Sequence, residues 1–130
     1  MKFFLDSAIA DEISYALDMW DIDGVTTNPR HVQVSGKPFM TAIREIGAMF
    51  EDYPDKTVSV QTNPHNHADW QAIVEEGRKF AAMSERFVIK MPSTEAGFKA
   101  CRVLAEDGIR SNLTLCFSPF QALAAMRAGA

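Results

Sequence analysis

The stretch Phe87-Val88-Ile89-Lys90-Met91-Pro92-Ser93-Thr94 carries the strongest fold signal in this chain. Its first five residues form an apolar run of strand length that contains one lysine, and a proline closes the run. Ser93 or Thr94 then stands where the N-terminal cap of a helix is expected. A helical stripe continues to Leu104, and Gly108 suits the C-terminal end of that helix. The stretch therefore predicts a strand at 87–91 followed directly by a helix.

The same alternation of strand and helix recurs on both sides of this stretch. Further strands are expected at 2–6, 24–28, 57–61 and 112–117. Apolar residues recur at helical spacing between them, as Ile9, Ile13, Leu17 and Trp20, as Phe39, Ile43, Ile46 and Phe50, and as Trp70, Ile73, Val74, Gly77 and Phe80. A loop is expected between Pro29, which stops the second strand, and Pro38.

Several residues suit the starts of these helices. Ser7 can cap the first helix, and Pro38 fits the first turn of the helix that contains Phe39. Ser118-Pro119-Phe120-Gln121 has a capping serine, a proline at the first helical position and a glutamine that can close a capping box. The last helix is therefore expected to start at Pro119.

Repeated strand and helix predict an α/β fold with parallel strands, organised as a single domain over residues 1–130. Right-handed crossovers then place the carboxyl ends of all strands at one end of the sheet. In barrels and in open α/β sheets that end carries the active site. Candidate functional residues are therefore sought at the ends of the strands.

Composition excludes several functional classes. The chain has 47% hydrophobic and 23% charged residues, which is typical of a folded domain and not of a disordered one. Its net charge of -4 and the lack of a basic block give no electrostatic basis for binding nucleic acid or an anionic membrane. No apolar run reaches the roughly 18 residues of a membrane span. Cys101 and Cys116 are expected to be buried free thiols of a cytoplasmic protein.

A polar residue stands at or near the carboxyl end of every expected strand. Because side chains alternate along a strand, one face of each strand is apolar and suits packing under helices. The other face ends in a polar group, and these groups are Asp6, Asn28, Gln61, Lys90 and Thr114. If the faces converge inside a barrel, the groups form a polar cluster at its mouth. A doubly wound sheet would favour apolar residues on both faces.

Lys90 lies inside an apolar strand and has two interpretations. It is either an edge-strand lysine whose amine reaches solvent or a desolvated amine. Burial favours the neutral amine, which is a nucleophile toward carbonyl groups. A lysine surrounded by one carboxylate, amides and hydroxyls suits Schiff-base chemistry. The same set is poor in the His and carboxylate ligands of a metal site, so no metal is expected.

Four motifs resemble the transaldolase family, and most closely its small-subunit branch that includes fructose-6-phosphate aldolase. These motifs are Phe3-Phe4-Leu5-Asp6-Ser7, Gly24-Val25-Thr26-Thr27-Asn28-Pro29, Val88-Ile89-Lys90-Met91-Pro92, and the segment from Gly108-Ile109 through Asn112-Leu113-Thr114 to Phe117-Ser118. They follow the family's order along the whole chain. The resemblance implies a partial TIM-type (β/α) barrel, with about five of the eight β/α units.

The resemblance also implies roles for individual residues in an aldol reaction of a small sugar or sugar phosphate. Lys90 would form the imine with a ketose, and Asp6 would take part in proton transfer. Asn28 and Thr26 would orient the three-carbon fragment, and Asn112 would hydrogen-bond near the Schiff base. Gln61 and Thr114 would position a catalytic water. Gln61 matches the aldolase branch, which releases dihydroxyacetone, whereas transaldolases pass that unit to an acceptor. Neither reaction needs a cofactor.

The length of the chain departs from the family pattern, since a complete barrel needs about 200 to 250 residues. The chain is expected to be a fragment, a half that is completed by a second copy, or a remnant without catalysis. The open sheet edge favours a homo-oligomer. A catalytically impaired remnant with a structural or binding role is therefore the alternative function. A deoxyribose-phosphate type of Schiff-base aldolase is a further alternative, which the Gly24–Pro29 motif disfavours.

Two other signals have simpler interpretations. His65-Asn66-His67 could belong to a metal site, but a polar loop is favoured because no third ligand is near in the sequence. Arg30 and His31 could reach a substrate anion, but a position on the loop surface is favoured.

Overall fold

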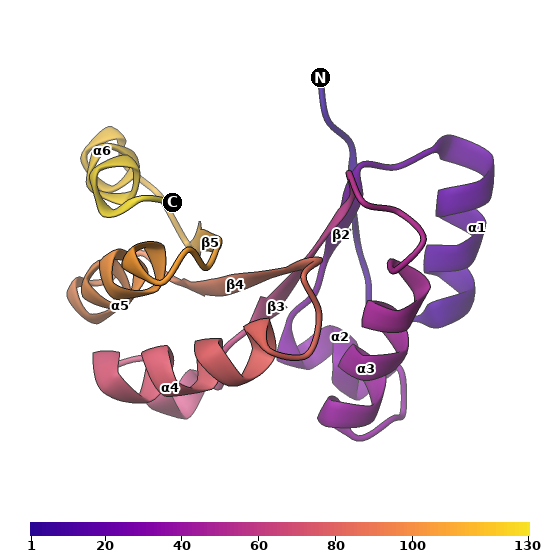
Figure 1. Cartoon of the computed structure of the whole chain (residues 1–130), viewed down its shortest axis with the longest axis horizontal. Coiled ribbons are helices and arrows are strands. Elements are labelled where there is room, and N and C mark those ends of the chain that lie inside the picture. Colours follow the sequence, from indigo (N-terminus) through magenta and orange to yellow (C-terminus); the bar gives the residue numbers. More distant parts are fainter. The chain divides into compact units, whose positions relative to one another are not determined.

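The computed structural model describes all 130 residues, Met1–Ala130. Its five strands are β1 (Phe4–Asp6), β2 (Gly24–Thr26), β3 (Thr57–Gln61), β4 (Phe87–Pro92) and β5 (Ser111–Thr114). They form one sheet in the order β1-β2-β3-β4-β5, and the pairs β1–β2, β2–β3 and β4–β5 are parallel. Helices alternate with these strands (Figure 1). The predicted class, a partial parallel (β/α) barrel, is confirmed.

The helices are α1 (Ala10–Trp20), α2 (Pro29–Val34), α3 (Phe39–Met49), α4 (Trp70–Ala81), α5 (Glu95–Glu106) and α6 (Pro119–Ala128), with a short 3-10 helix η1 (Pro64–Asn66). Two compact units divide the chain. One contains Met1–Val60 and Met83–Phe87, and the other contains Gln61–Ala82 and Val88–Ala130. The organisation of residues 1–130 as one domain stays a prediction.

In the first unit, α1 and α2 both pack against α3. Ile13 of α1, Ile43 of α3 and Val25 of β2 are completely buried in its core. Gly24 is needed where β2 begins, because a Cβ there would lie 2.3 Å from the carbonyl oxygen of Thr57. This close approach allows β2 to pair with the neighbouring strand from its first residue.

In the second unit, α5 packs against α4 on one side and α6 on the other. Ile89 and Met91 of β4 are completely buried, whereas Val88 and Lys90 are half-buried. The predicted alternation of an apolar and a mixed face along this strand is therefore confirmed. Gly97 lets α5 start close to the end of β4, because a Cβ at this position would lie 1.9 Å from the Pro92 carbonyl oxygen.

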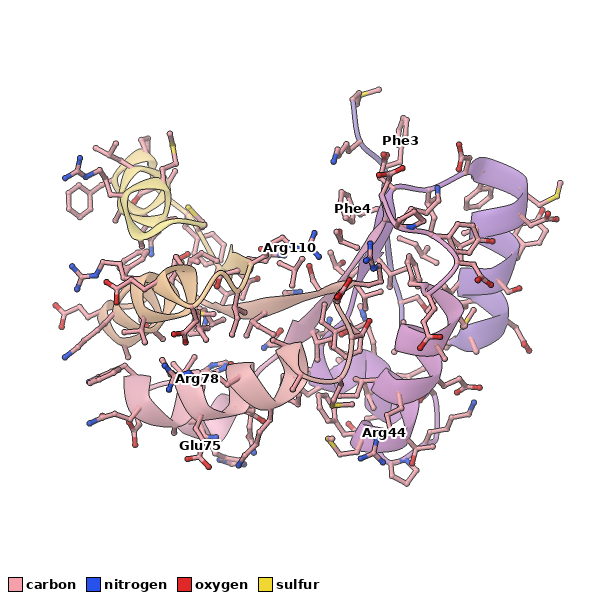
Figure 2. All side chains as sticks on the ribbon, in the orientation of Figure 1. Phe3, Phe4, Arg44, Glu75, Arg78 and Arg110 are labelled. Atoms are coloured by element: carbon pink, nitrogen blue, oxygen red, sulfur yellow. The ribbon has the colours of Figure 1, made fainter.

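Charged pairs lie on the surface of the second unit. Figure 2 shows Arg78 on the side of α4 that faces α5, and its Nε lies 2.8 Å from Asp107 Oδ2 beyond the end of α5. Glu75 projects from the opposite side of α4 and pairs with Lys79 at 2.7 Å. Such exposed pairs contribute little because water and salt screen them, so the buried apolar side chains dominate the stability.

Three predicted strands are shorter than expected. The strand predicted at 2–6 is found at Phe4–Asp6. The strand predicted at 24–28 ends at Thr26, because Asn28 caps a helix, α2, that begins at Pro29. The expected loop before Pro38 therefore contains a helix of six residues. The strand predicted at 112–117 is found at Ser111–Thr114. Leu115 has a φ of 60°, in the left-handed region, and this turn ends the extended backbone.

The helix starts agree with the sequence in part. Ser118 caps α6 by accepting from the Gln121 N–H at 3.1 Å, as predicted, but Gln121 Oε1 accepts from the N–H of Phe117 and not from that of Ser118. Thr94 caps α5. Ser7 does not cap α1, whose capping position is Ile9; instead Ser7 Oγ accepts from the Ile9 N–H.

Two further expectations about burial need correction. Trp20 ends the stripe of α1 but is 64% exposed, since it is the last residue of that helix. Both cysteines are free, but only Cys101 is buried, whereas Cys116 lies in the exposed turn after β5. Burial raises the pKa of the Cys101 thiol.

Replacing Val74 by alanine should lower the free energy of unfolding by roughly 1–3 kcal/mol, because the side chain is 4% exposed and truncation leaves a cavity. Val34→Ala is the matched control, since Val34 is also helical but 66% exposed. Both variants gain the same helix propensity. Urea unfolding followed by circular dichroism measures the difference, and equal losses in the two variants would contradict this core assignment.

Candidate functional site

The first group of predicted site residues lies at the carboxyl ends of β1 and β2. Asp6 and Thr26 are opposite one another in the strand register, and each is the last residue of its strand. The Thr26 hydroxyl donates to Asp6 Oδ1 at 2.7 Å. Asp6 remains exposed, so its carboxylate is oriented by the threonine and still open to a ligand.

Asn28 shapes the turn that follows β2. Its Oδ1 accepts from the His31 backbone N–H at 3.0 Å, and Pro29 occupies the first turn of α2. This is the usual geometry of an asparagine cap, and it fixes which side of the amide faces the helix. The amide nitrogen of Asn28 lies 3.1 Å from His31 Nδ1, and the same Nδ1 lies 3.4 Å from Asp6 Oδ1. Three of the predicted site residues, Asp6, Thr26 and Asn28, are therefore close together.

A second group of predicted site residues lies in the other unit, where Lys90 is on β4 and Asn112 is on β5. Lys90 is opposite Asn112 in the register of these two strands. Its neighbours Ile89 and Met91 are completely buried on the other face of β4. Lys90 itself is half-buried, which is less than the full desolvation expected from the sequence. The strand thus presents the lysine and the Asn112 amide from adjacent positions.

Gln61 and Thr114 lie at the ends of the strands on either side of β4 and are both half-buried. Thr62, which follows Gln61, donates its backbone N–H to the Lys90 carbonyl oxygen at 3.0 Å. The Thr114 carbonyl oxygen accepts from the Ser93 N–H at 2.8 Å. These backbone contacts hold the chain around Lys90 from both sides, and so constrain where Gln61 and Thr114 lie.

Buried hydroxyl residues follow the ends of β1, β2, β3 and β4, and the sequence reasoning did not predict the role they have there. They are Ser7, Thr27, Thr62 and Ser93, each at most 6% exposed. Each donates its backbone N–H to a carbonyl oxygen of the next strand, on Thr26, Ser59, Lys90 and Thr114 respectively. A buried carbonyl without such a partner would cost stability. The signal in the sequence is a Ser or Thr next to, or shortly after, a predicted site residue.

The seven predicted site residues therefore fall into two groups. Asp6, Thr26 and Asn28 belong to the first unit, and Gln61, Lys90, Asn112 and Thr114 belong to the second. His31 was expected on the loop surface, but it is the third residue of α2 and lies beside two of the predicted residues. Its position three residues after a capping Asn is the signal that could have found it.

Other candidate sites receive less support from the geometry. No three His, Cys, Asp or Glu side chains converge as a possible metal site. His65 is exposed in η1, and the ring nitrogen Nε2 of His67 lies 3.1 Å from the Thr62 carbonyl oxygen. No helix combines the length and the apolar character that crossing a membrane requires.

Comparison with protein families gives one match over nearly the whole chain. Residues 3–130 match the family described as Transaldolase/Fructose-6-phosphate aldolase. This match covers both groups of predicted site residues, and it includes β1 and β5.

Individual relatives agree with the family match. The chain is 52% identical over 132 residues to the 6-deoxy-6-sulfo-D-fructose transaldolase of Priestia megaterium. It is 43% identical over 130 residues to a protein of Hydrogenobaculum sp. named "Probable transaldolase", and 42% identical to one of the same name from Aquifex aeolicus. All of this chain is covered in each comparison, but only 57% of each relative. The chain thus spans little more than half the length of these relatives.

Thr27→Val should lower the free energy of unfolding by about 1 kcal/mol, because it removes a buried hydroxyl that donates to the Ser59 carbonyl oxygen at 2.8 Å. Thr41→Val is the control, since Thr41 is exposed on α3. Chemical unfolding of both variants checks this. A loss no greater in Thr27→Val than in the control would show that the hydroxyl does not anchor this turn.

Proposed function

Because the chain belongs to the transaldolase/fructose-6-phosphate aldolase family, we propose that it acts as a Schiff-base aldol enzyme on sugar phosphates or related sugars. One observation carries the proposal: Lys90 is a half-buried lysine within an apolar strand, on the other face of β4 from the buried Ile89 and Met91. Asn112 of β5 pairs with it in the strand register. An amine in a partly apolar setting is more easily available as the neutral nucleophile than one in water.

In the proposed reaction, the Lys90 amine attacks the carbonyl carbon of a ketose to give a carbinolamine. Loss of water then gives a protonated imine, which draws electrons from the neighbouring carbon–carbon bond. That bond breaks as the hydroxyl group beyond it loses its proton, so an aldehyde leaves and an enamine remains on Lys90. The enamine then takes up a proton, or attacks an acceptor aldehyde, before water releases the product.

The other predicted residues have roles that follow from their chemistry. Asp6 is the one carboxylate of the set, and it exchanges the proton of the reacting hydroxyl. Thr26 and Asn28 orient the three-carbon fragment by hydrogen bonds. Asn112 donates or accepts near the imine from the adjacent strand. Gln61 and Thr114 position the water that forms and cleaves the imine. None of these steps calls for a cofactor or a metal.

The acceptor of the three-carbon unit distinguishes two forms of this activity. The names of the relatives favour transfer to an acceptor aldose, whereas Gln61 favours release of dihydroxyacetone. The Priestia relative is named for a sugar with a sulfonate at C6, so an anionic group at that position is part of the proposed substrate class. Chromatography of the products with and without an added aldose distinguishes release from transfer.

The proposal includes the cellular setting and the assembly. The free thiols Cys101 and Cys116 suit the reducing cytoplasm. Because β1 and β5 are the two edges of the sheet, we expect the chain to associate with further copies that cover them. Light scattering at micromolar concentration should give a mass above 14.4 kDa. A stable monomer would contradict the homo-oligomer.

Lys90→Met should abolish covalent capture of a ketose. The protein is incubated with dihydroxyacetone or fructose 6-phosphate, treated with borohydride, and examined by intact-mass spectrometry. Wild type should show one reduced adduct, because borohydride reduces the imine, whereas Lys90→Met has no amine at this position. Lys99→Met is the matched control, since Lys99 lies exposed over the Trp70 ring at 4.0 Å.

The capture experiment also has an outcome that rejects the proposal. Folded wild-type protein without an adduct from either ketose would argue for a structural or binding role. An adduct that survives in Lys90→Met and disappears in Lys99→Met would place the reactive amine elsewhere.

A further inference from the structure

His31 occupies a position that the proposed reaction does not yet use. Asn28 caps α2 through the His31 backbone N–H, and Pro29 fixes the backbone between them. As a result the His31 side chain turns back toward the strand ends and is only 29% exposed. It therefore lies beside the site and not on the outer surface of the helix, where its neighbour Arg30 is exposed.

Two side chains of the site contact the imidazole ring. Asp6 Oδ1 lies 3.4 Å from Nδ1. The Asn28 amide nitrogen lies 3.1 Å from Nδ1 and 3.4 Å from Nε2. Because Asn28 Oδ1 is already engaged by the helix N–H, the group that faces the ring is the NH2, which can only donate.

These contacts restrict which ring nitrogen of His31 carries the proton. Nδ1 cannot both accept from Asn28 and donate to Asp6. A contact with a carboxylate is charge-assisted and is the stronger of the two. The Asn28 amide nitrogen is nearer to Nδ1 than to Nε2, but a bare Nδ1 would face the Asp6 carboxylate at 3.4 Å. The neutral form that avoids this repulsion has its proton on Nδ1, and Nε2 is then the ring nitrogen that can accept from the amide.

We propose that His31, as the Nδ1–H tautomer, is a positioning residue that links Asp6 to Asn28. Asp6 then has two orienting partners, the Thr26 hydroxyl on one side and His31 on the other. Its carboxylate is held in one rotamer toward the space above the strand ends. The functional part of this inference rests on the proposed aldol activity, because the role of Asp6 belongs to that reaction. The contact between the three side chains is independent of that activity.

Nuclear magnetic resonance tests the link directly and needs no activity. A long-range ¹H–¹⁵N spectrum of the chain is recorded at about pH 9, where an ordinary imidazole is neutral. The His31 signals are assigned by their loss in His31→Leu. The expected result is a protonated Nδ1 and a bare Nε2, with a shift of the population toward Nε2–H in Asp6→Asn. A wild-type ring that is predominantly Nε2–H overturns the inference.

Kinetics of imine capture test the role of this link. His31→Leu should reduce the rate constant of adduct formation, or of cleavage, by about 10- to 100-fold, as expected when a reacting group is misplaced by about 1 Å. The ketose concentration at half-saturation should change less than about twofold, because His31 does not hold the substrate. His31→Gln keeps an N–H that can reach Asp6 and should recover most of the loss.

Controls separate this role from a structural one and from failure of the proposed function. His65→Leu changes an exposed histidine and should leave the capture rate unaltered. His31→Leu with an unchanged capture rate overturns the inference even when wild type is active. If wild type forms no adduct, the proposed function fails, and the tautomer of His31 still decides whether it links Asp6 and Asn28.

Discussion

The structure depends on how the chain satisfies its backbone where each strand leaves the sheet. Backbone groups that are shielded from water where a strand leaves the sheet need hydrogen-bond partners. At four such ends a buried Ser or Thr donates its N–H to the carbonyl oxygen of the next strand, as Thr27 does to Ser59 and Thr62 does to Lys90. The residues Asp6, Thr26 and Gln61 directly precede three of these donors. Their positions are therefore a consequence of hydrogen bonding in the scaffold.

The alternation of strands and helices made the α/β class predictable, and the two-residue period of the strands made the position of the lysine predictable. The partial barrel was predicted from the family resemblance. On β4, alternate residues Ile89 and Met91 are buried while Lys90 is not, as the two-residue period requires. The polar residue at the end of each strand was visible for the same reason. The start of α6 was also predictable, because Ser118 and Pro119 suit adjacent positions at a helix start for different physical reasons.

Features that depend on a single backbone angle or on a tertiary contact escaped the sequence reasoning. α2 has only six residues, so it is too short to show a helical periodicity of apolar residues. Its capping Asn28 and first residue Pro29 were therefore interpreted as the end of a strand. The end of β5 depends on the positive φ of Leu115, a residue that rarely adopts it. The place of His31 beside Asp6 depends on the Asn28 cap, so its signal in the sequence has meaning only once a helix is known to begin at Pro29.

The cap of α2 has a consequence for changing this protein by laboratory evolution. Asn28 holds the helix with one side of its amide and faces His31 with the other. Aspartate, serine and threonine would all preserve the cap, but none of them offers the same amide nitrogen to the ring. Selection for stability alone would therefore accept replacements that selection for the proposed activity would reject. A library for new specificity should leave Asn28 unchanged. It should vary Arg30 instead, because this residue is exposed and is not the helix cap.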